Sequence, residues 1–167
     1  RTAAQLTRPF SRLERRGVEV VRGEIERIDP RAREVVVAGR RLTGDYLIVA
    51  LGAELAPELI PGLAEAGHNF YTLAGAEAFR DAFADVRGGK LVVLTAAPAY
   101  KCPAAPHEVA MLVESACRKR GMRAETEIAL FAAEPGPMGV AGPAMSAAVR
   151  QMVEAKGIGY HPDHQVQ

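Results

Sequence analysis

The chain has 167 residues, which is enough for one ordinary domain or for parts of two. Its hydrophobic content of 49% and charged content of 25% are typical of a folded globular protein and exclude a disordered chain. The formal net charge of +1 gives no electrostatic case for nucleic acid as a partner. No segment approaches the roughly 18 consecutive apolar residues of a membrane span.

The N-terminus indicates a trimmed or processed chain. Arg1, Thr2 and Ala3 are not followed by an apolar run, so we expect no signal peptide here, and the localisation is unknown from the sequence. Two cysteines give no disulfide framework. Four scattered histidines give no metal-ligand spacing, so we expect no metal site.

The first part of the chain predicts a helix and then a short antiparallel meander. Apolar residues at helical spacing predict a helix over residues 6–16. Runs of β-branched residues predict strands over residues 18–28 and 34–38, and a break is expected at residues 39–41. The continuous apolar run 45–50 predicts a strand that is buried on both faces of a sheet.

The second part alternates between strand and helix patterns. Residues 57–67, with prolines and glycines, are predicted to connect two domains, 1–56 and 57–167. The predicted elements that follow are a helix over 74–86, a strand over 90–95, a helix over 106–120, a strand over 126–133, a helix over 143–156 and the start of a strand at 157–160. We therefore predict an α/β fold, in which a Rossmann-like doubly wound parallel sheet follows a small β-meander.

The loop at residues 96–106 is expected at the carboxyl edge of that sheet, where such folds bind their ligands. A dinucleotide site needs glycines in this turn so that backbone N–H groups can reach the pyrophosphate. The loop has no glycine and three prolines, which disfavours an NAD(P) site. Glu134, just past the second strand, stands where a ribose-binding acid would be expected, but without the glycines an ordinary loop residue is the simpler interpretation.

Cys102 in this loop has a setting that favours the thiolate, because a helix N-terminus follows it and Lys101 adds a positive charge. The alternative is a buried structural cysteine. Cys117 lies on the apolar face of its helix and is expected in the core. It should be about 16 Å from the start of that helix, whereas a disulfide needs α-carbons within about 7 Å. A redox partner of Cys102 is therefore expected outside this sequence.

Residues 100–108 (YKCPAAPHE) resemble the cysteine motif of the sulfide:quinone oxidoreductases and of the flavoprotein subunits of flavocytochrome c sulfide dehydrogenases. Both belong to the superfamily of two-dinucleotide-domain flavoprotein disulfide reductases. Residues 44–53 resemble the strand and turn that close the FAD-binding domain, and residues 61–63 and 137–142 resemble later loops of the family. The resemblance implies that residues 1–56 end an incomplete FAD-binding domain and that residues 57–167 begin an NAD(P)-binding-like domain.

The resemblance also implies a chemistry. In the family, the cysteine that matches Cys102 lies beside the flavin and pairs with a second cysteine much later in the chain. Sulfide attacks that disulfide, the persulfide passes two electrons to FAD, and FAD reduces a quinone or a cytochrome c. The residues implied to lie near FAD are Ala50, Leu51 and Gly52 at the phosphates and Val21, Arg22 and Gly23 at the adenine end. Leu51 replaces the usual threonine, so only backbone contacts are expected there.

We expect the longer protein to be an FAD-dependent oxidoreductase of sulfide or a small thiol, peripherally attached to the bacterial inner membrane through segments outside this sequence. The FAD glycine fingerprint and the partner cysteine also lie outside it. The chain alone is therefore expected neither to retain FAD nor to oxidise sulfide. Two alternatives stay open: an NAD(P)H-linked flavoprotein of the same superfamily, and a non-catalytic Rossmann-like module in which Cys102 is incidental.

Overall fold

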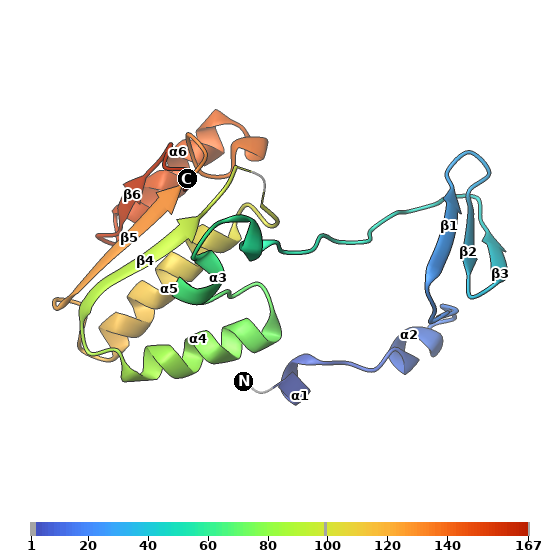
Figure 1. The fold of residues 1–167 in the computed structure, drawn as a ribbon, viewed down its shortest axis with the longest axis horizontal. Helices are drawn as coiled ribbons and strands as arrows, with labels where there is room; N and C mark the ends of the chain where they lie inside the picture. The colour runs from blue at the N-terminus through green and yellow to red at the C-terminus, as the bar shows by residue number, and fades with distance from the viewer. Residues whose placement is uncertain (1–2, 99, 167) are drawn as a thin grey trace. The chain divides into compact units, whose positions relative to one another are not determined.

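A computed structural model describes residues 3–98 and 100–166 of the chain (Figure 1). The chain divides into two compact units, Arg1–Ala53 and Glu54–Gln167. The boundary predicted between residues 56 and 57 falls close to this division. That the first unit ends an FAD-binding domain stays a prediction.

The first unit contains an antiparallel sheet of three strands, in the order β1 (Ile25–Asp29), β2 (Glu34–Val37) and β3 (Arg40–Thr43). The predicted meander is confirmed, but the break expected at residues 39–41 was wrong. Ala38 and Gly39 both have positive φ, at 48° and 72°. Two such residues make the tight turn whose twist suits a hairpin, so β2 returns directly as β3.

The residues before β1 also differ from the prediction. The helix expected over residues 6–16 is divided into α1 (Ala3–Leu6) and α2 (Ser11–Glu14). Pro9 lies between them, and proline lacks an N–H donor and disfavours helical backbone in the residue before it. The strand expected over residues 18–28 begins only at Ile25, where pairing with β2 starts.

Residues 45–50 do not form the predicted buried strand. They pair with no strand among the residues that the structure describes, and Tyr46 and Ile48 are 92% and 88% exposed. A strand that is buried on both faces needs paired neighbours and a covering layer on each face. Apolar composition alone therefore does not make these residues a strand in this unit.

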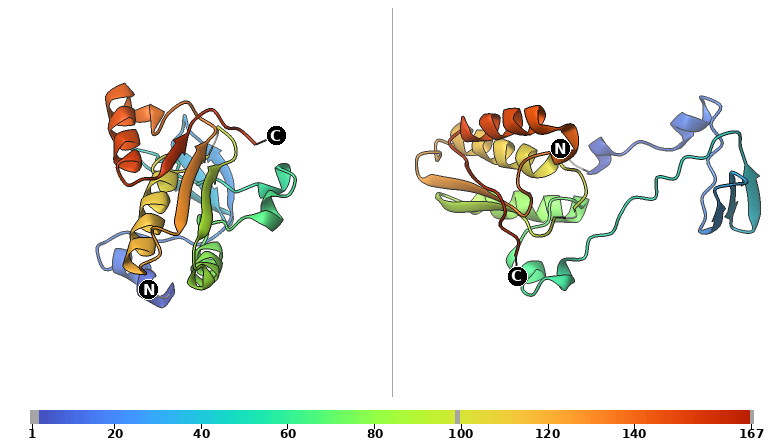
Figure 2. Two further views of the ribbon diagram at one scale, coloured as in Figure 1. Left: turned by 90° about the vertical axis from the view of Figure 1, so that its left-hand side faces the viewer. Right: turned by 90° about the horizontal axis from the view of Figure 1, so that it is seen from above.

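The second unit is built on a parallel sheet of three strands, in the order β4 (Gly89–Thr95), β5 (Thr126–Ala132) and β6 (Gly159–His161). Helix α5 (Ala105–Lys119) connects β4 to β5, and α6 (Pro143–Glu154) connects β5 to β6. Both helices lie on one face of the sheet (Figures 1 and 2), as right-handed crossovers between adjacent parallel strands require. The predicted Rossmann-like α/β fold is confirmed.

The remaining elements of the second unit precede β4 or lie between β5 and α6. Helix α4 (Leu73–Asp85) matches the helix expected over residues 74–86. The residues expected to connect two domains contain a short 3-10 helix, Pro57–Leu59, and α3 (Leu63–Ala66). A second 3-10 helix, Gly139–Ala141, precedes α6. In the part of the chain that the structure describes, no helix is long and apolar enough to cross a membrane.

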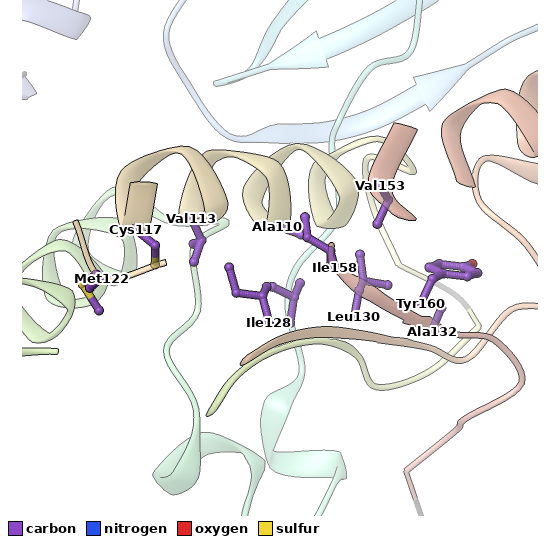
Figure 3. Packing of buried hydrophobic residues seen from close by; sticks show 11 residues of the cluster. Ala110, Val113, Cys117, Met122, Ile128, Leu130, Ala132, Val153, Ile158 and Tyr160 are labelled. Atoms are coloured by element: carbon purple, nitrogen blue, oxygen red, sulfur yellow. The ribbon is translucent and has the colours of Figure 1, made fainter. Parts of the chain in front are cut away.

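The core of the second unit lies between the sheet and the two crossover helices (Figure 3). Ala110, Val113 and Cys117 share one face of α5 because they follow helical spacing. Their partners come from the sheet, from α6 and from the turns: Val93, Met122, Ile128, Leu130, Ala132, Val153, Ile158 and Tyr160. Full burial of each larger aliphatic side chain stabilises the fold by about 1.5–3 kcal/mol. Cys117 is 0% exposed, as predicted from its position on the helix.

After β6 the chain turns back across the carboxyl ends of the other two strands. The Asp163 N–H donates to the Glu134 carbonyl oxygen at 3.2 Å, and the His164 N–H donates to the Ala132 carbonyl oxygen at 2.9 Å. The Val166 N–H then donates to the Ala96 carbonyl oxygen at 3.3 Å. This edge therefore brings together the loop after β4, the loop after β5 and the residues after β6.

Candidate functional site

Cys102 lies in the loop between β4 and α5, at the carboxyl edge of the parallel sheet. Its thiol is free and its side chain is exposed, which argues against a buried structural cysteine. The residue has a φ of 59°, and its carbonyl oxygen accepts a hydrogen bond at 3.0 Å from the N–H of Ala105, the first residue of α5. Left-handed backbone in a residue other than glycine costs about 1–3 kcal/mol and is concentrated at functional sites. The catalytic role of Cys102 stays a prediction.

Two positive groups lie beside Cys102 along the chain. One is the N-terminus of α5, where Pro106 occupies the first turn as predicted. The other is Lys101, whose Nζ lies over the Tyr71 ring, 5.9 Å from its centroid. Burial raises the pKa of Tyr71, and the negative charges of Cys102 and Glu134 raise it further, so Tyr71 keeps its proton at neutral pH.

Glu134 binds the loop that carries Cys102. One oxygen of its carboxylate accepts a hydrogen bond from the Tyr100 hydroxyl, and the other accepts one from the Thr95 hydroxyl at 3.1 Å. The Thr95 oxygen in turn accepts the N–H of Ala133 at 3.0 Å. Glu134 is a loop residue, as expected, but one whose carboxylate has two hydrogen-bond partners. Sequence reasoning missed this contact because its partners are 34 and 39 residues away along the chain.

Tyr100 stays protonated as the donor in this arrangement. Burial raises its pKa strongly, and the hydrogen bond to Glu134 raises it further. Tyr160, on β6, has its pKa raised to about 12, first by burial and then by the charge of Glu134. The two phenols therefore stay neutral across the physiological pH range, and Tyr100 is the one that donates to Glu134.

His107 is a second residue of this region that the sequence did not single out. It is 2% exposed, and its Nδ1 lies 3.2 Å from the carbonyl oxygen of Pro103. Burial lowers its pKa, which outweighs the opposing effects of that hydrogen bond and of Glu134. Its ring centroid lies 6.1 Å from that of Tyr160. Within the described residues, neither the His107 Nε2 nor the Tyr160 hydroxyl has a hydrogen-bond partner.

The residues predicted near the FAD adenine lie just before β1. Val21 is half-buried, and the Arg22 guanidinium carbon lies 5.5 Å from the centroid of the Phe10 ring. A Cβ on Gly23 would come within 2.8 Å of the Val37 side chain, so glycine permits a close approach to β2. The adenine contact of Val21, Arg22 and Gly23 stays a prediction.

The residues predicted near the FAD phosphates, Ala50, Leu51 and Gly52, are exposed. Gly52 has a φ of 76°, which favours glycine at this turn. Among the described residues, no group accepts a hydrogen bond from the backbone N–H of Leu51 or Gly52. Unpaired N–H donors at a glycine turn fit the backbone binding of a phosphate. The structure describes no contact between this turn and residues 21–23, so their shared site also stays a prediction.

Parallel strands joined by right-handed helical crossovers, with a functional loop at their carboxyl edge, define the dinucleotide-binding class of α/β folds. Residues 3–167 match the family model described as pyridine nucleotide-disulphide oxidoreductase. The chain therefore belongs to this family of FAD-dependent oxidoreductases. The predicted membership in the flavoprotein disulfide reductase superfamily is confirmed.

Two solved structures are similar to the chain. The sulfide:quinone oxidoreductase from the hyperthermophilic bacterium Aquifex aeolicus is 26% identical with a TM-score of 0.66, and the match covers 93% of this chain and 37% of that one. The ferredoxin reductase of the CYP199A2 system from Rhodopseudomonas palustris is 21% identical with a TM-score of 0.54, over 93% of this chain and 35% of that one. The second likeness shows the fold alone. The chain thus spans just over a third of the length of these structures.

Among the residues that the structure covers, no three His, Cys, Asp or Glu side chains come together as metal ligands. The polar groups at the carboxyl edge of the sheet are instead a thiol, a carboxylate and phenols. Such a set can hold an exposed thiol in a fixed place and supply neutral hydrogen-bond donors.

Proposed function

We propose that the chain is part of an FAD-dependent oxidoreductase that oxidises sulfide or a small thiol through a pair of cysteines, one of which is Cys102. The observation that carries the proposal is an exposed thiol in left-handed backbone at the carboxyl edge of the sheet, in a loop without glycine. The likeness to a sulfide:quinone oxidoreductase supports the same substrate class.

The proposed step is a thiol–disulfide exchange. A hydrosulfide ion attacks one sulfur of the cysteine pair, a new S–S bond forms as a persulfide, and the old S–S bond breaks to release the other cysteine as a thiolate. Both the N-terminus of α5 and Lys101 favour Cys102 as that thiolate. FAD, when bound in the longer protein, accepts the two electrons.

The partner cysteine is proposed to lie outside residues 1–167. Cys117 is the second cysteine of the chain, and it is fully buried in the core on the far part of α5. The electron acceptor is proposed to be a quinone or a cytochrome c. The name of the Aquifex aeolicus protein gives a quinone as its acceptor. A lipid-soluble acceptor agrees with the proposed peripheral attachment of the longer protein to the bacterial inner membrane. Membrane fractionation of the longer protein tests that attachment.

We also propose that the chain alone does not retain FAD. The turn at residues 50–52 follows residues 45–50, which are exposed apart from half-buried Leu47 and pair with no strand among the described residues. A cofactor site needs its contacts held in place by packed neighbours. The purified chain is therefore expected to be colourless, and stoichiometric flavin absorbance would contradict this.

An NAD(P)H-linked flavoprotein of the same family is the second candidate. It is disfavoured because the loop after β4 lacks the glycines and because Tyr100 and Thr95 already occupy the carboxylate of Glu134. The two candidates differ in which reductant bleaches the flavin of the longer protein. We expect sulfide to do so, and rapid bleaching by NADH in place of sulfide would favour the second candidate.

The reactivity of Cys102 tests whether this residue is functional or incidental. We expect iodoacetamide to alkylate it about tenfold faster than free cysteine at pH 6–7, because the thiol is exposed and lies beside Lys101 and the N-terminus of α5. Mass spectrometry of the digested chain measures the rate, and buried Cys117 is the internal control. The Lys101→Gln variant should react more slowly. A wild-type rate no faster than that of free cysteine would support the non-catalytic module.

A further inference from the structure

In the described part of the loop from β4 to α5, residues 96–98 and 100–104, few backbone hydrogen bonds fix the position of Cys102. Pro98 and Pro103 remove backbone donors from this loop. At the start of the loop, the Ala96 carbonyl oxygen accepts the N–H of Val166. At its other end, the loop continues into α5, which begins at Ala105. Cys102 is joined to that end, because its carbonyl oxygen accepts the Ala105 N–H at 3.0 Å, and Tyr100 before it is held by a side-chain contact.

Tyr100 provides such a contact two positions before Cys102. Its half-buried hydroxyl donates to the carboxylate of Glu134, which follows β5, so it crosses from one strand end to the next. Glu134 is itself fixed on both sides. Its second oxygen is bound by the Thr95 hydroxyl, and its backbone carbonyl oxygen accepts the N–H of Asp163.

A carboxylate held in this way is a suitable anchor for this loop. Hydrogen bonds to an ionised oxygen are shorter and stronger than those between neutral groups. The partly buried surroundings also make loss of a partner costly, because an unpaired polar group would remain away from water. Tyr71 offers a useful contrast, because its hydroxyl belongs to the same region but has no hydrogen-bond partner within the described residues.

We propose that Glu134 is a positioning residue, which fixes the Cys102 loop by accepting the hydrogen bond of Tyr100. The inference deepens the proposed function, because the position of Cys102 matters to catalysis only if the thiol reacts. The contact itself is independent of any substrate or cofactor.

Hydrogen exchange of the chain, measured by mass spectrometry, tests the contact directly. The Tyr100→Phe and Glu134→Ala variants should raise the exchange rate of the loop peptide that includes Cys102 by about tenfold, since its local opening no longer breaks this contact. Peptides from the core of α5 and β5 should exchange as in the wild type. The Glu134→Gln variant keeps an oxygen that can accept from Tyr100, so it should restore most of the protection.

The Tyr71→Phe variant is the matched control, because it removes a hydroxyl from the same region without removing a hydrogen bond. It should leave the exchange of the loop unchanged. The proposal is overturned if Tyr100→Phe leaves the loop at the wild-type rate, if Tyr71→Phe has an equal effect, or if exchange rises throughout the second unit. Should Glu134→Ala not fold, Tyr100→Phe decides alone, since it removes one oxygen atom from an otherwise intact ring.

Alkylation of Cys102 gives a second measurement. The Tyr100→Phe variant keeps the charge of Glu134, so a change in rate reports position and not electrostatics. Loss of the contact with Glu134 should slow alkylation about threefold, because the thiol is then held less firmly beside the helix N-terminus, and an unchanged rate would overturn the proposal. Neither measurement involves sulfide oxidation. Failure of the positioning role therefore leaves the proposed function standing, and a sulfide-inactive longer protein would leave the positioning role standing.

Discussion

His107 shows how one buried side chain couples the stability of the second unit to pH. Its ring is enclosed at the start of α5, and burial lowers its pKa below the ordinary value. In the unfolded chain a histidine has a pKa of about 6.5. As the pH falls through that value, the unfolded chain binds a proton that the folded chain does not, so stability is lost towards acid.

The prediction is that the His107→Gln variant loses less stability than the wild type between pH 8 and pH 5. Urea unfolding at a series of pH values measures the free energy of unfolding of each. The His68→Gln variant is the control, because His68 is exposed and adds no buried proton-binding group. Parallel pH curves for wild type and His107→Gln would contradict the prediction.

At the residue scale, the sequence predicted where Cys102 lies but did not predict the hydrogen bond between Tyr100 and Glu134. Cys102 was expected at the carboxyl edge of the sheet because a strand, a loop and a helix follow one another in the chain. The contact of Tyr100 with Glu134 depends on which way a ring turns and on the register of two strands. Neither is encoded by any spacing along the chain.

At the scale of elements, α4 depends on a glycine in its first turn. The hydroxyl oxygen of Thr72 accepts the N–H of Gly75 at 3.1 Å, which caps the helix. The Asn69 backbone approaches so closely that a Cβ on Gly75 would lie 1.8 Å from the Asn69 carbonyl oxygen. An added methyl group must therefore displace the backbone that leads into the helix.

We expect the Gly75→Ala variant to lower the free energy of unfolding by roughly 1–3 kcal/mol, the usual cost of overpacking. Each kcal/mol should lower the melting temperature by about 2–4 °C in a chain of this size. Gly139→Ala is the control, because a Cβ there would meet nothing within 4 Å. Thermal melts followed by circular dichroism make the comparison, and equal melting temperatures for the two variants would refute it.

The strands and helices of the second unit were predictable because the spacing of their apolar residues indicates which faces are buried. The strands β4 and β5 are continuous apolar runs between helices with one apolar face, which is the pattern of a covered parallel sheet. The same pattern misled at residues 45–50, where no described strand provides the neighbours. Strand β3 was missed because its arginines and threonine carry no apolar signal, and only the turn at Ala38 and Gly39 directs the chain into it.

At the scale of the whole molecule, burial is distributed unequally between the two units. The clustered core belongs to Glu54–Gln167, whereas Val37 and Glu34 are the buried residues among those described in the first unit. Glu34 is held there by ion pairs with Arg27 at 2.5 Å and Arg41 at 3.1 Å. The units divide after Ala53, close to the prolines and glycines of residues 57–67. The unequal burial was not predictable from the sequence, because it depends on which elements cover one another.

The contact of Val166 with Ala96 also bears on the order of folding. It joins residues far apart in the chain, so we expect it to form after the more local contacts of β5, α6 and β6. We therefore expect the base of the Cys102 loop to close late, and the thiol to acquire its final surroundings after the core is in place. Pulsed hydrogen exchange during refolding measures this, and protection of the loop before β5 would contradict it. A thiol that reaches its native surroundings last is exposed to adventitious oxidation for longest while the chain is still folding.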